Sequence, residues 1–204
     1  MSPKVVNKDE KRAHILRAAL PVFAHKGVNN VKMIDIATAA AVGKGTLYEY
    51  FPSKEDLIVG AFTLFADNWS SYLNEQINSL AEPAEIIGQY IRSSLEFFKD
   101  NRQLFAILSD MYAAGIPREH REPLFSEFGA RFETALQKLS SVIQEGIDQK
   151  VFRAVNPREV ASIIFAALDG ILSQSILNLI EIDSEAPANS LIETLLKGIL
   201  VDSK

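Results

Sequence analysis

Residues 34–54, IDIATAAAVGKGTLYEYFPSK, constrain the fold more than any other part of the chain. Their apolar residues are spaced so that two short helices, at about 33–40 and 44–50, can pack across a tight turn. The side chains left on or near the outer face are Lys44, Thr46, Tyr48 and Tyr50. A helix pair that presents small, basic and aromatic residues is typical of a helix-turn-helix unit, whose second helix enters the major groove of DNA.

A longer set of features surrounds this unit and keeps a constant order and spacing from His14 to Leu57. The set is Ile15-Leu16, Ala18-Ala19, Phe23, Gly27, Ile36-Ala37, Val42, Gly45-Thr46-Leu47-Tyr48, Tyr50-Phe51 and Ser53-Lys54-Glu55. On these residues the chain strongly resembles the N-terminal domain of the TetR family of bacterial transcriptional regulators. The resemblance implies an all-α fold of about nine helices, with a DNA-binding domain in residues 1–54 and an effector-binding and dimerisation domain in residues 55–204.

Three positions depart from the family pattern. Lys32 stands where a threonine cap is common, so the helix that follows lacks the usual side-chain acceptor. Ala41 occupies a turn position usually held by glycine, which is strained if its φ angle is positive. Gly43 replaces the usual serine at the start of the second helix and is a weaker cap.

Composition excludes several kinds of chemistry. The chain has no cysteine and only three histidines, which argues against thiolate catalysis and histidine-rich metal sites. No nucleophile–base pair, phosphate-binding loop or zinc motif is visible. We therefore predict no enzymatic activity, no catalytic or metal-binding residues and no cofactor. The charged N-terminus shows no signal peptide, so we expect a cytoplasmic protein.

Charge is divided unevenly along the chain. Residues 1–54 contain nine Lys and Arg against four Asp and Glu, a net charge of +5. The remaining residues contain twelve against twenty-two, a net charge of −10, which accounts for the overall −5. This asymmetry favours an N-terminal end that faces phosphate.

Helical patterns fill nearly all of the chain, because no segment alternates with a period of two. Start signals are Asn7 with Glu10, Ser53 with Asp56, Pro83, and Asn156 before Pro157. Pro21 should kink or loosen the first helix, and Gly27 should end it. Later helices are predicted at about 54–78, 83–99, 104–112, from Pro123 to about 150, from 157 onward, and at 188–201.

The predicted helix that begins at 157 is apolar on nearly every side. Asp169, Gln174 and Asn178 lie inside it, and a central aspartate alone costs ~2.5–3.5 kcal/mol on membrane-insertion scales, so we expect no membrane span. The family resemblance implies that the last two helices pair with those of a second subunit. Candidate interface residues are Gly170, Ser173, Leu191, Leu195 and Ile199. Small residues such as Gly170 are equally compatible with tight packing inside one chain.

The resemblance also suggests roles in DNA binding. Lys44, Gly45 and Thr46 would face base edges, while Tyr48 and Lys54 would contact phosphate. Tyr50 could reach either, and we add Lys32 as a backbone contact. The alternative is that Tyr48 and Tyr50 only pack the small domain.

The body carries residues that resemble the lining of an effector cavity in this family. They are Trp69, Phe98, Phe105, Met111, Tyr112, Phe128, Phe132 and Phe165, with Asp169, Gln174 or Tyr112 as polar anchors. Each aromatic residue alone is more simply part of an ordinary core. Asp169 could equally bond a neighbouring helix end. The ligand expected from these residues is hydrophobic.

Together these patterns predict a homodimeric transcriptional regulator, most simply a repressor released from a palindromic operator by a hydrophobic effector. The alternative is a helical small-molecule-binding or enzymatic protein with a vestigial helix-turn-helix, which only the departures at Lys32, Ala41 and Gly43 support.

Overall fold

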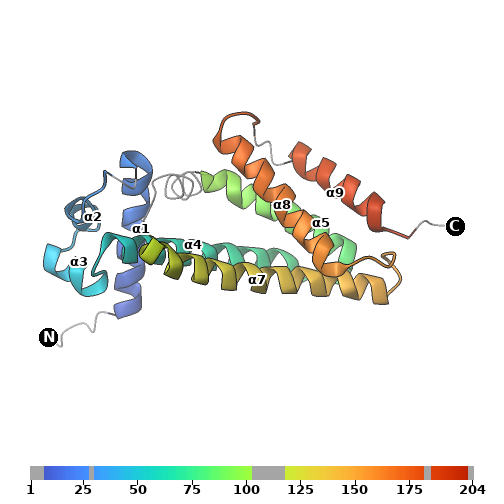
Figure 1. Ribbon diagram of the computed structural model, residues 1–204, viewed down its shortest axis with the longest axis horizontal. Helices are drawn as coiled ribbons and strands as arrows, with labels where there is room; N and C mark the ends of the chain where they lie inside the picture. The colour runs from blue at the N-terminus through green and yellow to red at the C-terminus, as the bar shows by residue number, and fades with distance from the viewer. Residues whose placement is uncertain (1–6, 28–29, 103–117, 182–184, 202–204) are drawn as a thin grey trace. The chain divides into compact units, whose positions relative to one another are not determined.

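The computed structural model describes residues 7–27, 30–102, 118–181 and 185–201 of the chain. The helices in these ranges (Figure 1) are α1 Lys8–Lys26, α2 Met33–Ala39, α3 Lys44–Tyr50, α4 Lys54–Ile77, α5 Pro83–Asp100, α7 Arg118–Asp148, α8 Pro157–Ile176 and α9 Glu185–Ile199. The all-α fold class is therefore confirmed. The helix predicted at 104–112 lies outside the described residues.

The chain divides into two compact units. The first comprises residues 1–68 and 103–128, and the second comprises residues 69–102 and 129–204. The first part of α4 therefore packs with the N-terminal helices. The boundary predicted after residue 54 separates proposed functions rather than packing units, and it stays a prediction.

The first unit has one apolar core made by α1, α2, α3 and the start of α4. Its fully buried large side chains are Ile15, Leu16, Phe23, Ile36, Leu47, Phe51 and Leu57. Gly60 marks the closest packing, because a Cβ atom there would lie 3.0–3.1 Å from side-chain atoms of Leu16, Arg12 and Phe51. The guanidinium of Arg12 lies 4.9 Å from the centroid of the Phe51 ring.

The predicted helix ends are confirmed where local capping sets them. The side chain of Asn7 accepts a hydrogen bond from the Asp9 amide at 3.1 Å, and α1 begins at the next residue. Gly27 has φ 73° and donates its amide to the Phe23 carbonyl. Ser53 Oγ accepts from the Asp56 amide at 3.0 Å and donates to the Asp56 carboxylate at 2.7 Å, which fixes the start of α4.

Pro21 does not end the first helix, and the prediction that it kinks or loosens the last turn stays a prediction. It lies exposed within α1, which continues without a break to Lys26.

In the second unit, α5 packs against both α8 and α9 (Figure 1). Ile87, Ile91 and Leu95 of α5 are fully buried. The loop after α7 pairs with the end of α9, because the Arg153 amide donates to the Ile199 carbonyl at 2.8 Å and the Val201 amide donates to the Val151 carbonyl at 3.1 Å.

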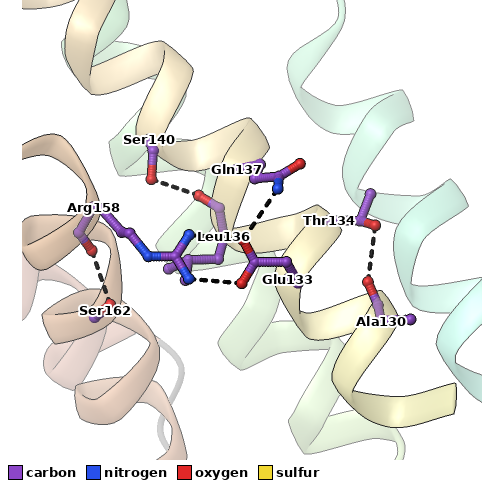
Figure 2. A network of polar contacts seen from close by, with 8 residues as sticks. All are labelled: Ala130, Glu133, Thr134, Leu136, Gln137, Ser140, Arg158 and Ser162. Atoms are coloured by element: carbon purple, nitrogen blue, oxygen red, sulfur yellow. Dashed lines mark hydrogen bonds and ion pairs between the residues drawn. The ribbon is translucent and has the colours of Figure 1, made fainter. Parts of the chain in front are cut away.

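A bidentate ion pair connects α7 to the first turn of α8 (Figure 2). Both nitrogens of the Arg158 fork lie 2.7 Å from the carboxylate oxygens of Glu133, and Gln137 donates to the same carboxylate at 3.0 Å. The hydrogen bonds between the two side chains lower the pKa of Glu133 and raise the pKa of Arg158. Asn156 caps α8 beside this pair by accepting the Arg158 and Glu159 amides.

Helix α8 is the one described helix that is long and apolar enough to cross a membrane by length and composition. Core packing explains part of that character, because Val160, Ala161, Ile164, Leu168 and Leu172 are buried within the chain. Its remaining apolar surface includes Ile163, which is 58% exposed.

Candidate DNA-binding and effector sites

The turn between α2 and α3 is held by the backbone. The Val42 amide donates to the Ala37 carbonyl at 2.9 Å, and the Ala41 amide donates to the Thr38 carbonyl at 3.1 Å. Ala41 has φ 50°, in the left-handed region that favours glycine. The departure at this position therefore introduces the backbone strain that the sequence predicted for a positive φ.

Lys32 makes no side-chain cap for α2, as its sequence predicts, but a different residue compensates. The Asp35 carboxylate accepts the Lys32 amide at 2.9 Å and lies 2.8 Å from the Lys26 ammonium of α1. The hydrogen bond from Lys26, then that from the Lys32 backbone, lowers the pKa of Asp35. One carboxylate thus caps α2 and ties it to α1. Sequence reasoning missed this role.

His14 provides a second tie from α1 to the helix-turn-helix unit. Its Nε2 lies 2.9 Å from the Ala40 carbonyl and donates to it. That carbonyl belongs to the residue that ends α2, so the bond holds the turn against α1. No local sequence pattern predicts this contact, because the partners are 26 residues apart.

The outer face of α3 is open. Lys44, Gly45 and Tyr48 are exposed, while Thr46 and Tyr50 are half-buried. A Cβ atom added at Gly45 would meet nothing within 4 Å. The Lys44 ammonium lies 5.9 Å from the centroid of the Tyr48 ring, so the two side chains occupy one surface. On the opposite side, Leu47 is fully buried.

Of the other DNA-binding candidates, Lys32 is exposed and Lys54 is half-buried at the first residue of α4. The exposure of 41% at Tyr48 argues against the alternative that this ring only packs the small domain. For Tyr50 the alternative stays open, because it packs partly against the core of the first unit.

The structure brings several of the predicted effector residues together in the second unit. Trp69 lies with its ring centroid 5.8 Å from that of Phe98. Phe165 contacts Phe132 edge to face at 5.0 Å, and Tyr90 in the same manner at 5.9 Å. Tyr90, buried on α5, was not among the predicted residues.

Phe105, Met111 and Tyr112 lie outside the described residues, as does the side chain of Phe128 on α7. Asp169 is exposed on α8, so within one chain its side chain faces solvent rather than the aromatic cluster. Its role as a polar anchor stays a prediction that this position does not favour.

The predicted interface residues differ in exposure. Ser173 is exposed, and Gly170 has open space where a side chain would lie. Leu191 and Leu195 are half-buried, whereas Ile199 is buried within its own chain. Ile163, Leu177 and Leu179, which were not predicted, are more than half exposed at or just beyond α8. Their apolar surface is available to a second subunit.

A small domain with a packed helix pair, an exposed recognition helix that begins at Lys44, and a further helical body are typical of a helix-turn-helix DNA-binding regulator. The family model described as "Bacterial regulatory proteins, tetR family" matches residues 15–61. Residues 15–61 therefore carry the DNA-binding domain of the TetR family of bacterial transcriptional regulators.

Relatives match over almost the whole chain. The fatty acid metabolism regulator protein of Bacillus subtilis is 25% identical over 193 residues, which cover 94% of this chain and 97% of that protein. The uncharacterised regulator YfiR of the same organism is 28% identical over 86% of each chain. The structure of the Bacillus subtilis regulator FadR in complex with stearoyl-CoA has a TM-score of 0.76 and 25% identity, with 92% of this chain and 98% of that chain covered.

The chain is thus a ligand-responsive DNA-binding transcriptional regulator. The alternative of a vestigial helix-turn-helix is not favoured. Its support came from the weak caps, and the ties made by Asp35 and His14 hold the unit in place.

Proposed function

We propose that this protein is a cytoplasmic, non-enzymatic homodimeric repressor that binds a palindromic operator through α3 and leaves it when an apolar acyl thioester binds the helical body. The observation that carries the DNA-binding part is the division of α3 into a buried side at Leu47 and an open side with Lys44, Gly45 and Tyr48. The buried side fixes the helix, so the open side meets DNA as a rigid surface.

Each candidate residue has a chemistry suited to one part of the duplex. Lys44 donates to guanine acceptors, Thr46 contacts a thymine methyl group, and Gly45 lets the backbone approach the base edges. Tyr48 and Lys54 donate to phosphate oxygens and fix the register. Lys32 adds a backbone contact at the start of α2.

A set of substitutions separates these two kinds of contact. Lys44→Ala and Thr46→Ala should change the preferred operator sequence, whereas Tyr48→Phe and Lys54→Ala should weaken binding to all sequences alike. Removing a phosphate contact should also reduce the salt dependence by about one unit of slope in log Kd against log salt. Lys138→Ala is the matched control, because it removes an exposed lysine from the second unit.

The measurement is operator affinity at several salt concentrations, with the operator selected from genomic fragments. Unchanged affinity and sequence preference in all four variants, as in Lys138→Ala, would refute the proposed face.

The effector part is supported by the aromatic cluster in the second unit and by the likeness to a regulator crystallised with stearoyl-CoA. For a ligand to release DNA, it must bind the DNA-incompetent state more tightly, and operator DNA must weaken its binding by the same factor. Titrating palmitoyl-CoA with and without operator tests this coupling. Equal affinity in both titrations would contradict release by this ligand class.

A further inference from the structure

Three hydrogen-bond donors are buried in the second unit without a protein partner among the described residues. They are the Tyr90 hydroxyl, the Trp69 indole N–H and the Ser175 hydroxyl. Burying such a group without a partner costs about 1–3 kcal/mol, so native proteins rarely leave it unused. Tyr90 is only 6% exposed. Burial raises its pKa, so the hydroxyl keeps its proton and is available as a donor.

Two of these donors, on Tyr90 and Trp69, lie beside the rings proposed to receive the effector. Tyr90 packs edge to face on Phe165, and Trp69 packs on Phe98. Tyr90 and Phe98 are eight residues apart on α5, which corresponds to about 12 Å along the helix. This interior therefore offers donors at two levels along an apolar helix face, which suits an extended molecule that carries acceptors.

The charge of the buried side chains limits the chemical class of the ligand further. Within the part of the chain that the structure describes, the polar residues buried like Tyr90 are Ser93, Ser94 and Ser175, with no lysine or arginine. A carboxylate moved into such an interior would lose its hydration without gaining a counter-charge. A neutral carbonyl loses far less and still accepts one strong hydrogen bond.

We propose that the Tyr90 hydroxyl donates a hydrogen bond to an uncharged carbonyl of the effector, and that this bond favours a thioester over a thioether of the same length, while the lack of a buried cation disfavours the free acid. The inference rests on the proposed function for the location of the effector, and it adds the residue that reads the ligand's polar group. Tyr90 is thus a specificity-determining residue, whereas the surrounding phenylalanines supply only apolar contact.

The test compares three probes that share one chain length: palmitoyl-CoA, its thioether analogue hexadecyl-CoA, and palmitate. Trp69 is the single tryptophan of the chain, so its fluorescence reports binding from within the same unit. In the wild-type protein, palmitoyl-CoA should bind about ten-fold more tightly than hexadecyl-CoA, because the thioether cannot accept the bond. Palmitate should bind more weakly than palmitoyl-CoA.

Tyr90→Phe should abolish the preference for palmitoyl-CoA over hexadecyl-CoA by weakening the binding of palmitoyl-CoA alone. Tyr72→Phe is the matched control, because the Tyr72 hydroxyl donates to Glu96 at the exposed edge of the same unit, and it should keep the ten-fold preference. The free energy of unfolding of Tyr90→Phe should equal or exceed that of the wild type, since the hydroxyl makes no bond to a described protein group.

The outcomes separate this inference from the proposed function. A thioester preference that survives in Tyr90→Phe, or that is absent from the wild type, overturns the role of Tyr90 and leaves the acyl thioester as effector. Failure of palmitoyl-CoA to bind the wild type overturns the proposed effector and the Tyr90 contact with it. A Tyr90→Phe protein that unfolds more easily than the wild type shows that the hydroxyl has a structural partner, which also overturns the inference.

Discussion

Replacing Ala41 with glycine tests whether the turn of the helix-turn-helix unit stores backbone strain. Ala41 is exposed and has φ 50°. A left-handed conformation costs a residue other than glycine about 1–2 kcal/mol. Glycine removes that cost but loses about 0.4–1 kcal/mol through the greater freedom of the unfolded chain. Ala41→Gly should therefore raise the free energy of unfolding by about 0.5–1 kcal/mol.

Ala39→Gly is the matched control, because it makes the same chemical change two residues earlier, at an exposed position in α2. There glycine only lowers helix stability, by about 0.5–1 kcal/mol. Ala41→Gly should be more stable than the wild type and Ala39→Gly less stable, so the free energies of unfolding of the two variants should differ by about 1–2 kcal/mol.

The assay is urea unfolding followed by circular dichroism at one fixed protein concentration, since the stability of a dimer depends on concentration. Operator affinity of Ala41→Gly should stay within about two-fold of the wild type, because the hydrogen bonds of the turn do not involve the Ala41 side chain. An Ala41→Gly protein no more stable than Ala39→Gly would refute the strain argument.

Two further substitutions test packing and pairing. Gly146→Ala should destabilise the fold by about 2 kcal/mol despite better helix propensity, because the new Cβ would lie 2.2 Å from the buried Phe152 ring. Gly129→Ala on the same helix is the control, because its Cβ meets open space and the change should stabilise the fold. Equal urea midpoints for the two variants would contradict this prediction. Asp35→Asn should remove the stabilisation from Lys26. Pairing with Lys26 lowers the pKa of Asp35 below 3.8, so this stabilisation is full above pH 3.8 and is lost as the pH falls through the pKa of Asp35 in the folded protein. The unfolding midpoints of variant and wild type should therefore converge in acid. A difference between the two midpoints that stays constant with pH would count against the ion pair.

Features set by local sequence were predictable. Asn7, Ser53 and Asn156 each lie beside the amides that they cap, so a stretch of three or four residues contains all the information needed to start a helix. The same holds for Ala41, whose positive φ follows from the tight turn between α2 and α3.

Features that depend on tertiary contact were not predictable. The Asp35–Lys26 pair and the His14–Ala40 bond join α1 to the helix-turn-helix unit across separations that no short pattern reports. Tyr90 was overlooked because an aromatic residue on the apolar face of a helix is usually part of the hydrophobic core. Only the structure shows that its hydroxyl lies buried without a described protein acceptor.

Helix α8 shows why interface residues are the hardest to assign from sequence. Its pattern is apolar all round, and periodicity cannot tell which side meets its own chain. The structure resolves this, because Ile164, Leu168 and Leu172 are buried while Ile163 is 58% exposed on the same helix. Ile199 on α9 lies on the inner side instead, so its substitution should lower the stability of each subunit. The exposed part of the Ile163 side chain contacts only solvent in one chain. In a homodimer, this side of α8 packs against the second subunit, which supplies the apolar contact that one chain lacks.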